Sequence, residues 1–304
     1  MPDSHKFSDE ELMSELGIDR KTLKRFKEIR AATVKEARMR GRTGRKIRVL
    51  GVSGSARDEM GKAQQKSNSE ELLESCLAAC RKLGAETELL ALRKYDIKPC
   101  QACYSTTNTQ CHFPCSCFPK GTPQGDDMSN LIYGKVLAAD VIIIATPVNN
   151  FKMSTMTAAF LDRCISLDGS LAPANPLAPK DKELNIKHTR FIELTADNAI
   201  LGSGFLRRFS GKTAGIIVTG HEEGASLVIS SLFMTLSHFG MSFPPFSNMY
   251  AMSSVCLPTY ADKPRVTGKC YALEAEILAE NLMIAAKLAK NVKTTDWKNN
   301  YSSN

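Results

Sequence analysis

The stretch Asp140-Val-Ile-Ile-Ile-Ala145 contains an unbroken run of five apolar residues, as long as any in the chain. Its β-branched residues and short length predict a strand, and the lack of alternating polar residues predicts that both faces of the strand are buried. A similar run, Thr213-Ala-Gly-Ile-Ile-Val-Thr219, lies further along the chain. Because strands buried on both faces belong to parallel sheets covered by helices, these two stretches predict an α/β protein.

Shorter strand patterns and amphipathic helix patterns alternate around these two runs. Further strands are expected at 46–52, at 86–91 and, more weakly, near 241–246, and helices at 67–83, 127–139, 153–165, 225–239 and 268–291. This alternation predicts one doubly wound domain with a five-stranded parallel sheet.

Residues 1–45 are predicted to form a helical N-terminal arm and linker. Ser8-Asp-Glu-Glu11 has the form of a capping box, and apolar residues follow it at helical spacing. Thirteen of the 40 Lys and Arg residues lie between Arg20 and Arg48, against two acidic residues. Two interpretations stay open. The favoured one is an amphipathic arm that packs on the body or on a neighbouring subunit, and the other is a basic arm that contacts nucleic acid.

The main domain is predicted to span 46–292 and to carry two features that a five-stranded sheet does not need. A cysteine loop covers 100–117, and a Pro-rich insertion covers 166–211. An insertion of this length is usually a lid or a subunit contact, so His188 is expected at its surface. Residues 293–304 are predicted to be a polar C-terminal tail.

Composition excludes several classes of protein. With 43% hydrophobic residues in a chain of 304, the protein is neither collagen-like nor wholly disordered. No apolar run approaches the ~20 residues that span a bilayer, and the charged N-terminus contains no secretory segment, so a cytoplasmic location without a membrane partner is expected. Ten cysteines are too few for a disulfide scaffold, and the gathering of half of them in 100–117 indicates metal or redox chemistry.

Three polar loops follow the expected strands, at the edge of the sheet where this class of protein binds ligands. The first, Gly51-Val-Ser-Gly-Ser-Ala-Arg57, leads to Lys66-Ser-Asn-Ser69 at the start of a helix. Hydroxyls, positive charge and a helix N-terminus together suit a phosphate dianion, and an ordinary polar turn is the alternative. The loop is neither a Walker loop nor a Gly-x-Gly-x-x-Gly dinucleotide fingerprint.

The other two loops are Ala145-Thr-Pro-Val-Asn-Asn-Phe151 and Val218-Thr-Gly-His-Glu-Glu-Gly-Ala225. Taken together, the three loops resemble those of the NADPH-dependent FMN reductase family, over about residues 46–250. Within that family, Pro99-Cys-Gln-Ala-Cys103 followed by Gly125-Asp-Asp-Met128 is similar to the iron–sulfur flavoprotein branch. The resemblance implies a flavodoxin-like fold.

The resemblance also implies FMN as the cofactor and assigns residues to each part of it. The first loop would hold the phosphate, the second would lie along the isoalloxazine ring, and the third would close the other side of the ring. The residues of the three loops are, in that order, Ser53, Ser55, Arg57, Ser67, Asn68 and Ser69; Pro147, Val148, Asn149, Asn150 and Phe151; and Thr219, Gly220, His221 and Gly224.

Some positions in these loops need a separate interpretation. The family commonly has an aromatic residue after Pro-Val, where this chain has Asn149, so stacking on the ring is expected to be weaker or to come from Phe151. His221 is either a residue that tunes the reduction potential of the flavin or a loop histidine that faces water. No catalytic residue is expected, because a flavin carries its own chemistry.

Three interpretations of the cysteine loop stay open. Cys100, Cys103, Cys111, Cys115 and Cys117 offer five thiols for the four places of a [4Fe–4S] cluster, and Cys115 and Cys117 are alternatives for the fourth place. The same set suits a zinc ion, and the third interpretation is packing or a redox-active pair without a metal. The spacing is less compact than that of the iron–sulfur flavoproteins.

The residues and the resemblance together predict an FMN-dependent oxidoreductase, linked to NAD(P)H or to ferredoxin, that reduces a quinone or another small acceptor. NAD(P)H is the expected co-substrate, and a homo-oligomer (dimer or tetramer) is expected. Two alternatives stay open. One is an electron-carrier flavoprotein without a substrate site of its own, and the other, less favoured, is a redox-sensitive protein that binds nucleic acid through the basic arm.

Overall fold

A parallel sheet forms the centre of the computed structural model, which describes residues 7–40, 45–106, 111–197, 200–220, 224–253, 261 and 263–290. Its strands are β1 (Arg48–Ser53), β2 (Glu86–Ala91), β3 (Val141–Asn149), β4 (Lys152–Met153), β7 (Thr213–Gly220) and β8 (Asn248–Met252). The order is β2-β1-β3-β7-β8, all parallel, and β4 pairs antiparallel with the end of β3. The five-stranded, doubly wound parallel sheet of the flavodoxin-like class is therefore confirmed.

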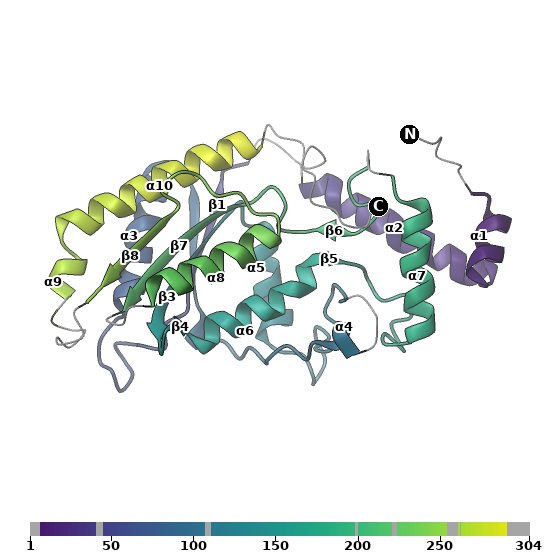
Figure 1. Ribbon diagram of the computed structural model, residues 1–304, viewed down its shortest axis with the longest axis horizontal. Coiled ribbons are helices and arrows are strands. Elements are labelled where there is room, and N and C mark those ends of the chain that lie inside the picture. Colours follow the sequence, from purple (N-terminus) through teal and green to yellow (C-terminus); the bar gives the residue numbers. More distant parts are fainter. Residues whose placement is uncertain are drawn as a thin grey trace.

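Helices cover both faces of this sheet (Figure 1). On one face lie α3 (Asn68–Lys82) and α10 (Lys269–Ala289), and on the other α5 (Tyr133–Ala138), α6 (Thr155–Cys164) and α8 (Ala225–His238). Successive residues of β3 alternate between the two cores, because side chains of a strand point to opposite faces. Ile143 packs with α3 and α10, and Ile142 and Ile144 pack on the opposite side.

The last strand lies later than predicted. Residues near 241–246 make only a single bridge with the sheet, between Ser242 and Thr213, and the strand β8 begins at Asn248. Pro244 and Pro245 follow the bridge. Because proline has no N–H to donate to a neighbouring strand, this pair prevents the predicted strand from continuing.

Short elements complete the fold. The helix predicted at 127–139 begins with a π-helical turn, η2 (Met128–Ile132), before α5. The others are η1 (Leu92–Lys94), α4 (Cys103–Thr106), η3 (Ile165–Leu167), β5 (Asp168–Ser170), β6 (Leu206–Arg207) and α9 (Lys263–Val266). Within the described part of the chain, none of the helices is long and apolar enough to cross a bilayer.

The N-terminal arm packs on the insertion of its own chain. Its helices are α1 (Asp9–Leu16), which begins at the predicted capping box of Ser8 and Glu11, and α2 (Arg20–Arg40). They bury their apolar faces against α7 (Lys182–Thr195) and the Pro-rich loop before it. The buried residues of this cluster are Leu12, Leu16, Leu23, Phe26, Leu171, Ala174, Phe191 and Ile192.

The cations of the arm divide into two groups. Some hold the arm in place: Arg25 donates to the carbonyl oxygen of Ala174 at 3.3 Å, and Arg30 donates to that of Thr195 at 3.1 Å. Others, Lys21, Lys24, Lys35 and Arg38, are exposed on the side of α2 away from this core. The basic character of the arm therefore serves packing in part. The linker predicted at its end falls largely on residues 41–44, and the C-terminal tail on 293–304, outside the described residues.

His188 is buried, contrary to the surface position predicted for it. Its ring is only 3% exposed and stacks on Phe26 of α2 with 4.4 Å between the ring centroids. Burial lowers the pKa of His188 to about 4. The sequence did not reveal this because the partner ring comes from the arm, far away along the chain.

The buried imidazole makes stability depend on pH. Since the pKa of His188 is about 4 in the fold and about 6.5 in the unfolded chain, the unfolded chain binds more protons between these values, and stability falls as pH falls through that window. Between pH 7.5 and pH 5.0 we expect this group to account for a loss of about 2 kcal/mol.

Urea unfolding of wild type and of His188→Phe at the two pH values measures this contribution. The variant keeps an aromatic ring against Phe26 but cannot be protonated, so it should lose less stability on acidification. His238→Phe removes an exposed imidazole that lies 3.7 Å from Asp168, and it measures how much of the pH dependence comes from a histidine outside the buried cluster. An equal loss in wild type and in His188→Phe would contradict the assignment.

Candidate functional site

The three predicted loops lie together at one edge of the sheet. β1, β3 and β7 are neighbours and run parallel, with Ser53 paired to Ala145 and Pro147 paired to Thr219. Their carboxyl ends therefore open on the same edge (Figure 1). The residues that the sequence assigned to phosphate, ring and ring closure come from the last residues of these strands, from the loops after them and from the start of α3.

Gly54, directly after β1, is locked against the start of α6. Its N–H donates to the carbonyl oxygen of Ala145 at 2.8 Å, and its own carbonyl oxygen accepts from the Ser154 hydroxyl at 2.6 Å. A Cβ on Gly54 would lie 1.8 Å from the Thr157 hydroxyl oxygen, so no other residue fits there. The first and second loops are thus held in a fixed relation.

The first loop forms a polar cradle in front of α3. Ser55, Ser67, Asn68 and Ser69 are all buried, and the Ser67 hydroxyl caps α3 by accepting from the N–H of Glu70. The half-buried Arg57 has no ion-pair partner for its guanidinium within the described part of the chain. Buried hydroxyls, the first-turn N–H groups of a 15-residue helix and an uncommitted guanidinium fit a phosphate dianion.

Two side chains of this loop are committed to carboxylates instead. The Ser53 hydroxyl donates to Glu70 at 2.6 Å, and Lys66 forms an ion pair with Glu74 at 2.5 Å. Sequence reasoning missed Glu70, and it also missed Arg93, which follows β2 and pairs with the same carboxylate. The sequence does contain a signal for them. Acidic residues lie within and directly after the predicted phosphate loop, and they require a compensating cation.

The second loop is a tight hairpin between β3 and β4. Asn150 and Phe151, its two turn residues, have φ of 51° and 64°, in the left-handed region. A two-residue hairpin turn of this type favours Asn at the first position and Gly at the second, so a phenylalanine there is strained. The Phe151 side chain is 54% exposed. Such strain at an exposed aromatic residue is typical of a ligand contact.

The third loop begins against the back of this hairpin. Thr219 is buried at the end of β7, and a Cβ on Gly220 would lie 3.0 Å from the Cβ of Val148. A Cβ on Gly224 would lie 2.9 Å from the Cα of Phe151, so glycine is required for this approach. His221 lies outside the described residues, and neither of its two interpretations is tested.

The cysteine loop is held at both ends by Arg163 of α6. Its guanidinium donates to the carbonyl oxygen of Lys98 at 3.0 Å, before the loop, and pairs with Asp126 after it. Both side chains of the pair are at most 1% exposed. The guanidinium also lies over the Phe118 ring at 4.3 Å. One buried cation thus closes the loop that contains all five candidate ligands.

Within the loop the thiols contact one another. Hydrogen bonds with Cys111 and Cys117, together with the Lys180 ammonium 2.8 Å away, lower the pKa of Cys103 to about 2. A hydrogen bond with Cys117 also lowers the pKa of Cys115 to about 6. The described residues contain no group of three or more Cys, His, Asp or Glu side chains arranged to hold a single metal ion. The donor chemistry, five thiols in one loop, nevertheless fits thiolate-ligated iron.

The insertion contributes to this loop directly. Lys180 donates to the sulfur of Cys103, the N–H of Phe113 donates to the carbonyl oxygen of Leu171 at 3.0 Å, and Arg208 lies over the Phe113 ring at 4.4 Å. The same Arg208 pairs with Glu36 of α2 at 2.9 Å. The insertion therefore lies between the arm and the cysteine loop and contacts both.

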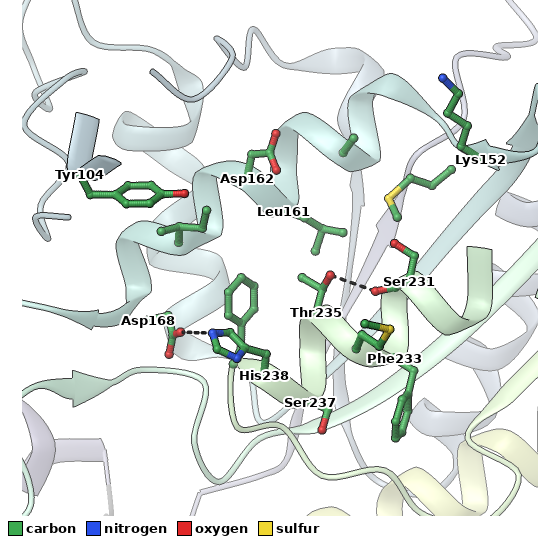
Figure 2. A pocket seen from close by; sticks show the side chains of 15 residues that line it. Tyr104, Lys152, Leu161, Asp162, Asp168, Ser231, Phe233, Thr235, Ser237 and His238 are labelled. Carbon is green, nitrogen blue, oxygen red and sulfur yellow. Dashed lines mark hydrogen bonds and ion pairs between the residues drawn. The ribbon is translucent and has the colours of Figure 1, made fainter. Parts of the chain in front are cut away.

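A groove of about 1040 Å³ runs between α6 and α8 (Figure 2). Leu161 and Phe239 line it, with Lys152 at the hairpin end and the pair of Asp168 and His238, 3.7 Å apart, at the other end. Tyr104 reaches it from the cysteine loop. Sequence patterns do not reveal this groove, because its walls come from two separate helices.

The comparison with known families agrees with this geometry. Residues 47–182 match the NADPH-dependent FMN reductase family. That segment is just under half of the chain, and it contains the first two loops and the cysteine loop. The resemblance predicted from the loops is confirmed.

Two curated proteins that are similar in sequence to this chain are iron–sulfur flavoproteins. An iron–sulfur flavoprotein of Methanosarcina thermophila is 30% identical over 121 residues, 40% of this chain and 54% of the relative. Another, of Archaeoglobus fulgidus, is 31% identical over 120 residues, 39% of this chain and 51% of the relative. The matched segment spans about half the length of these relatives.

Among solved structures, RosB with bound 8-demethyl-8-formylriboflavin-5′-phosphate aligns over 82% of this chain and 83% of its own. The TM-score is 0.58 and the sequence identity 18%, so this likeness shows a shared fold.

The buried pair of Arg163 and Asp126 allows a direct test of how the cysteine loop is held. Removing one partner of a fully buried pair leaves the other charge uncompensated, so Arg163→Met should cost about 3–5 kcal/mol of unfolding free energy. Urea unfolding measures this loss, and limited proteolysis should show faster cleavage between 98 and 126.

The double variant Arg163→Met with Asp126→Asn is the control, because it removes both charges. We expect it to recover part of the loss. Equal losses in the single and double variants would show that the pair does not act as a unit.

Proposed function

We propose that the protein is an FMN-dependent oxidoreductase. The observation that carries the proposal is the convergence of three loops at the carboxyl edge of the sheet, with a phosphate cradle at one end and the strained Phe151 at the other. The match of residues 47–182 to the FMN reductase family supports FMN as the ligand of this edge.

The first loop would hold the FMN phosphate. Ser55, Ser67, Asn68 and Ser69 would donate from side chains and from the first turn of α3, and Arg57 would supply the positive charge. Ser53 would act indirectly, since its hydroxyl already donates to Glu70. This differs from the direct phosphate contact that the family resemblance implies for Ser53.

The second and third loops would hold the isoalloxazine ring. Pro147 to Phe151 would lie along it, with Phe151 supplying the aromatic surface that Asn149 does not, and Thr219, Gly220 and Gly224 would close the opposite side. Bound FMN would supply hydride and single-electron chemistry of its own. The protein's part is then to bind and orient the flavin and to exclude water around it.

An iron–sulfur cluster is the second cofactor that we propose. Cys100, Cys103 and Cys111, with either Cys115 or Cys117, would be its ligands. Both curated relatives are iron–sulfur flavoproteins, and the clamp by Arg163 keeps the loop closed around its thiols. Zinc and a metal-free thiol loop are the competing outcomes, and an iron analysis distinguishes them.

For the reaction we propose NAD(P)H or ferredoxin as the electron donor and a quinone or similar small molecule as the acceptor. Steady-state oxidation of NAD(P)H in the presence of a quinone separates this proposal from an electron carrier without a substrate site, which would show no such turnover. Nucleic-acid binding by the exposed cations of α2 is the less favoured alternative. It predicts an affinity that falls steeply with salt.

We also propose that the protein forms a homo-oligomer. Apolar side chains beside the groove are exposed on α8, with Leu227 61% and Met234 69% exposed. Such an exposed apolar face is typical of a protein–protein contact. Sedimentation velocity of the wild type would test this, since a monomer at all concentrations would contradict it.

The absorption spectrum of anaerobically purified protein tests the cofactor proposal. We expect flavin bands with about one FMN per chain, and stoichiometric iron and acid-labile sulfide. Flavin bands without iron would contradict the proposed cluster and would still support the proposed flavin enzyme. A protein that stays colourless after incubation with FMN would contradict the whole proposal.

Phe151→Gly tests whether the strained residue serves the flavin. Glycine adopts a positive φ without strain, so the flavin-free variant should be as stable as wild type or more stable by about 1 kcal/mol. FMN should bind about tenfold more weakly, because an aromatic contact is lost.

Phe246→Gly is the matched control for this variant. Phe246 also has a positive φ and an exposed ring, and it lies outside the three loops. It should show the same effect on stability and none on the fluorescence titration with FMN. An unchanged FMN affinity in Phe151→Gly would show that the Phe151 ring does not contribute to FMN binding.

A further inference from the structure

Arg93 joins the end of β2 to both sides of the phosphate loop. Its guanidinium donates to Asp58, within the loop, at 2.9 Å, and to Glu70, in the first turn of α3, at 3.0 Å. The Arg93 side chain is only 14% exposed. No motif or family resemblance pointed to this residue, which follows a different strand from the loop that it contacts.

Glu70 is the reason that such a cation is needed. This carboxylate is 1% exposed and lies directly after Ser69, in the turn that would receive the phosphate. Burial opposes its ionisation, but hydrogen bonds from Arg93 and Ser53 outweigh burial and hold the pKa of Glu70 below its ordinary value. The negative charge of Glu70 therefore lies in the same helix turn that is proposed to bind an anion.

The ion pairs around the loop compensate these negative charges. Lys66 is paired with Glu74, and Arg93 faces both Glu70 and Asp58. Arg57 has no ion-pair partner within the described part of the chain, so its charge stays available for a ligand. Without Arg93, Glu70 and Asp58 would lose their ion-pair partner beside the cradle, and their charges would repel a phosphate dianion.

We propose that Arg93 is a positioning residue for phosphate recognition, and this rests on the proposed function of the cradle as an FMN site. It shapes the loop by holding Asp58 and α3 to the end of β2, and it screens the buried carboxylate of Glu70 from the phosphate. Its effect is specific to ligands that carry the phosphate group.

The test compares FMN with riboflavin, which has the same ring but no phosphate. Fluorescence titrations of the full-length chain, freed of bound flavin, give the affinity for each ligand. Arg93→Met should weaken FMN binding by at least about tenfold, since an uncompensated charge acts on a dianion across a partly buried site. Riboflavin affinity should stay within about threefold of the wild type.

Two further variants separate screening from mere support of the loop. Arg93→Lys keeps the charge and should retain most of the FMN affinity. Arg93→Met combined with Glu70→Gln removes the repelling carboxylate along with the cation, and it should recover much of the FMN affinity lost in the single variant. A loop that is simply loosened would show no such recovery and would weaken both ligands alike.

Arg48→Met is the matched control, because it breaks an exposed pair of Arg48 with Glu86 on the same sheet, at 3.1 Å. Circular dichroism of every variant establishes that it is folded. Two results would contradict the proposed role of Arg93 when the wild type binds FMN. In one, Arg93→Met binds FMN as tightly as the wild type, and in the other it loses affinity for FMN and for riboflavin to the same extent. If wild type binds neither flavin, the proposed function fails and the inference fails with it.

Discussion

A buried network of hydroxyls at the start of α6 is the constraint on which the site depends. Ser154 caps this helix, its hydroxyl donates to the carbonyl oxygen of Gly54, and its N–H donates to the Thr146 hydroxyl oxygen at 3.1 Å. Thr157 completes the network by donating to Thr146. Because every member is buried and satisfied, the loops after β1 and β3 cannot move independently. The phosphate cradle and the hairpin of Phe151 are therefore one rigid unit.

The other end of the same helix organises the cysteine loop. Arg163 lies about two turns beyond Thr157 and binds both ends of the loop through Lys98 and Asp126. A buried ion pair contributes little net stability compared with an apolar pair of the same volume. It specifies one arrangement here, because Arg163 and Asp126 bond to each other and also to the backbone of Lys98 and Ser129. A single short helix thus fixes the distance and orientation between the edge of the sheet proposed for the flavin and the thiols.

Charge in this protein is local rather than global. Residues 20–48 carry 13 Lys and Arg against two acidic residues, a local excess of +11 in a chain with a net charge of +8. Part of this excess holds α2 to the insertion and part is exposed. At the candidate site, by contrast, Lys66 and Arg93 pair with carboxylates, and among the described residues Arg57 has no ion-pair partner. The insertion connects the arm with the cysteine loop through Arg208, which pairs with Glu36 and lies over the Phe113 ring. An estimate of binding chemistry from the total charge would therefore mislead.

The sequence by itself determined the sheet, most of its helices, and the three loops at its edge, because apolar periodicity and turn residues are local signals. It misplaced the last strand, whose position depends on the proline pair, and it placed His188 on the surface. Only the tertiary structure decided that His188 is buried under Phe26, that Arg93 screens Glu70, and that Lys180 touches Cys103. Each of these contacts joins residues from different elements, and pairing across such distances in the chain leaves no periodic trace in either segment.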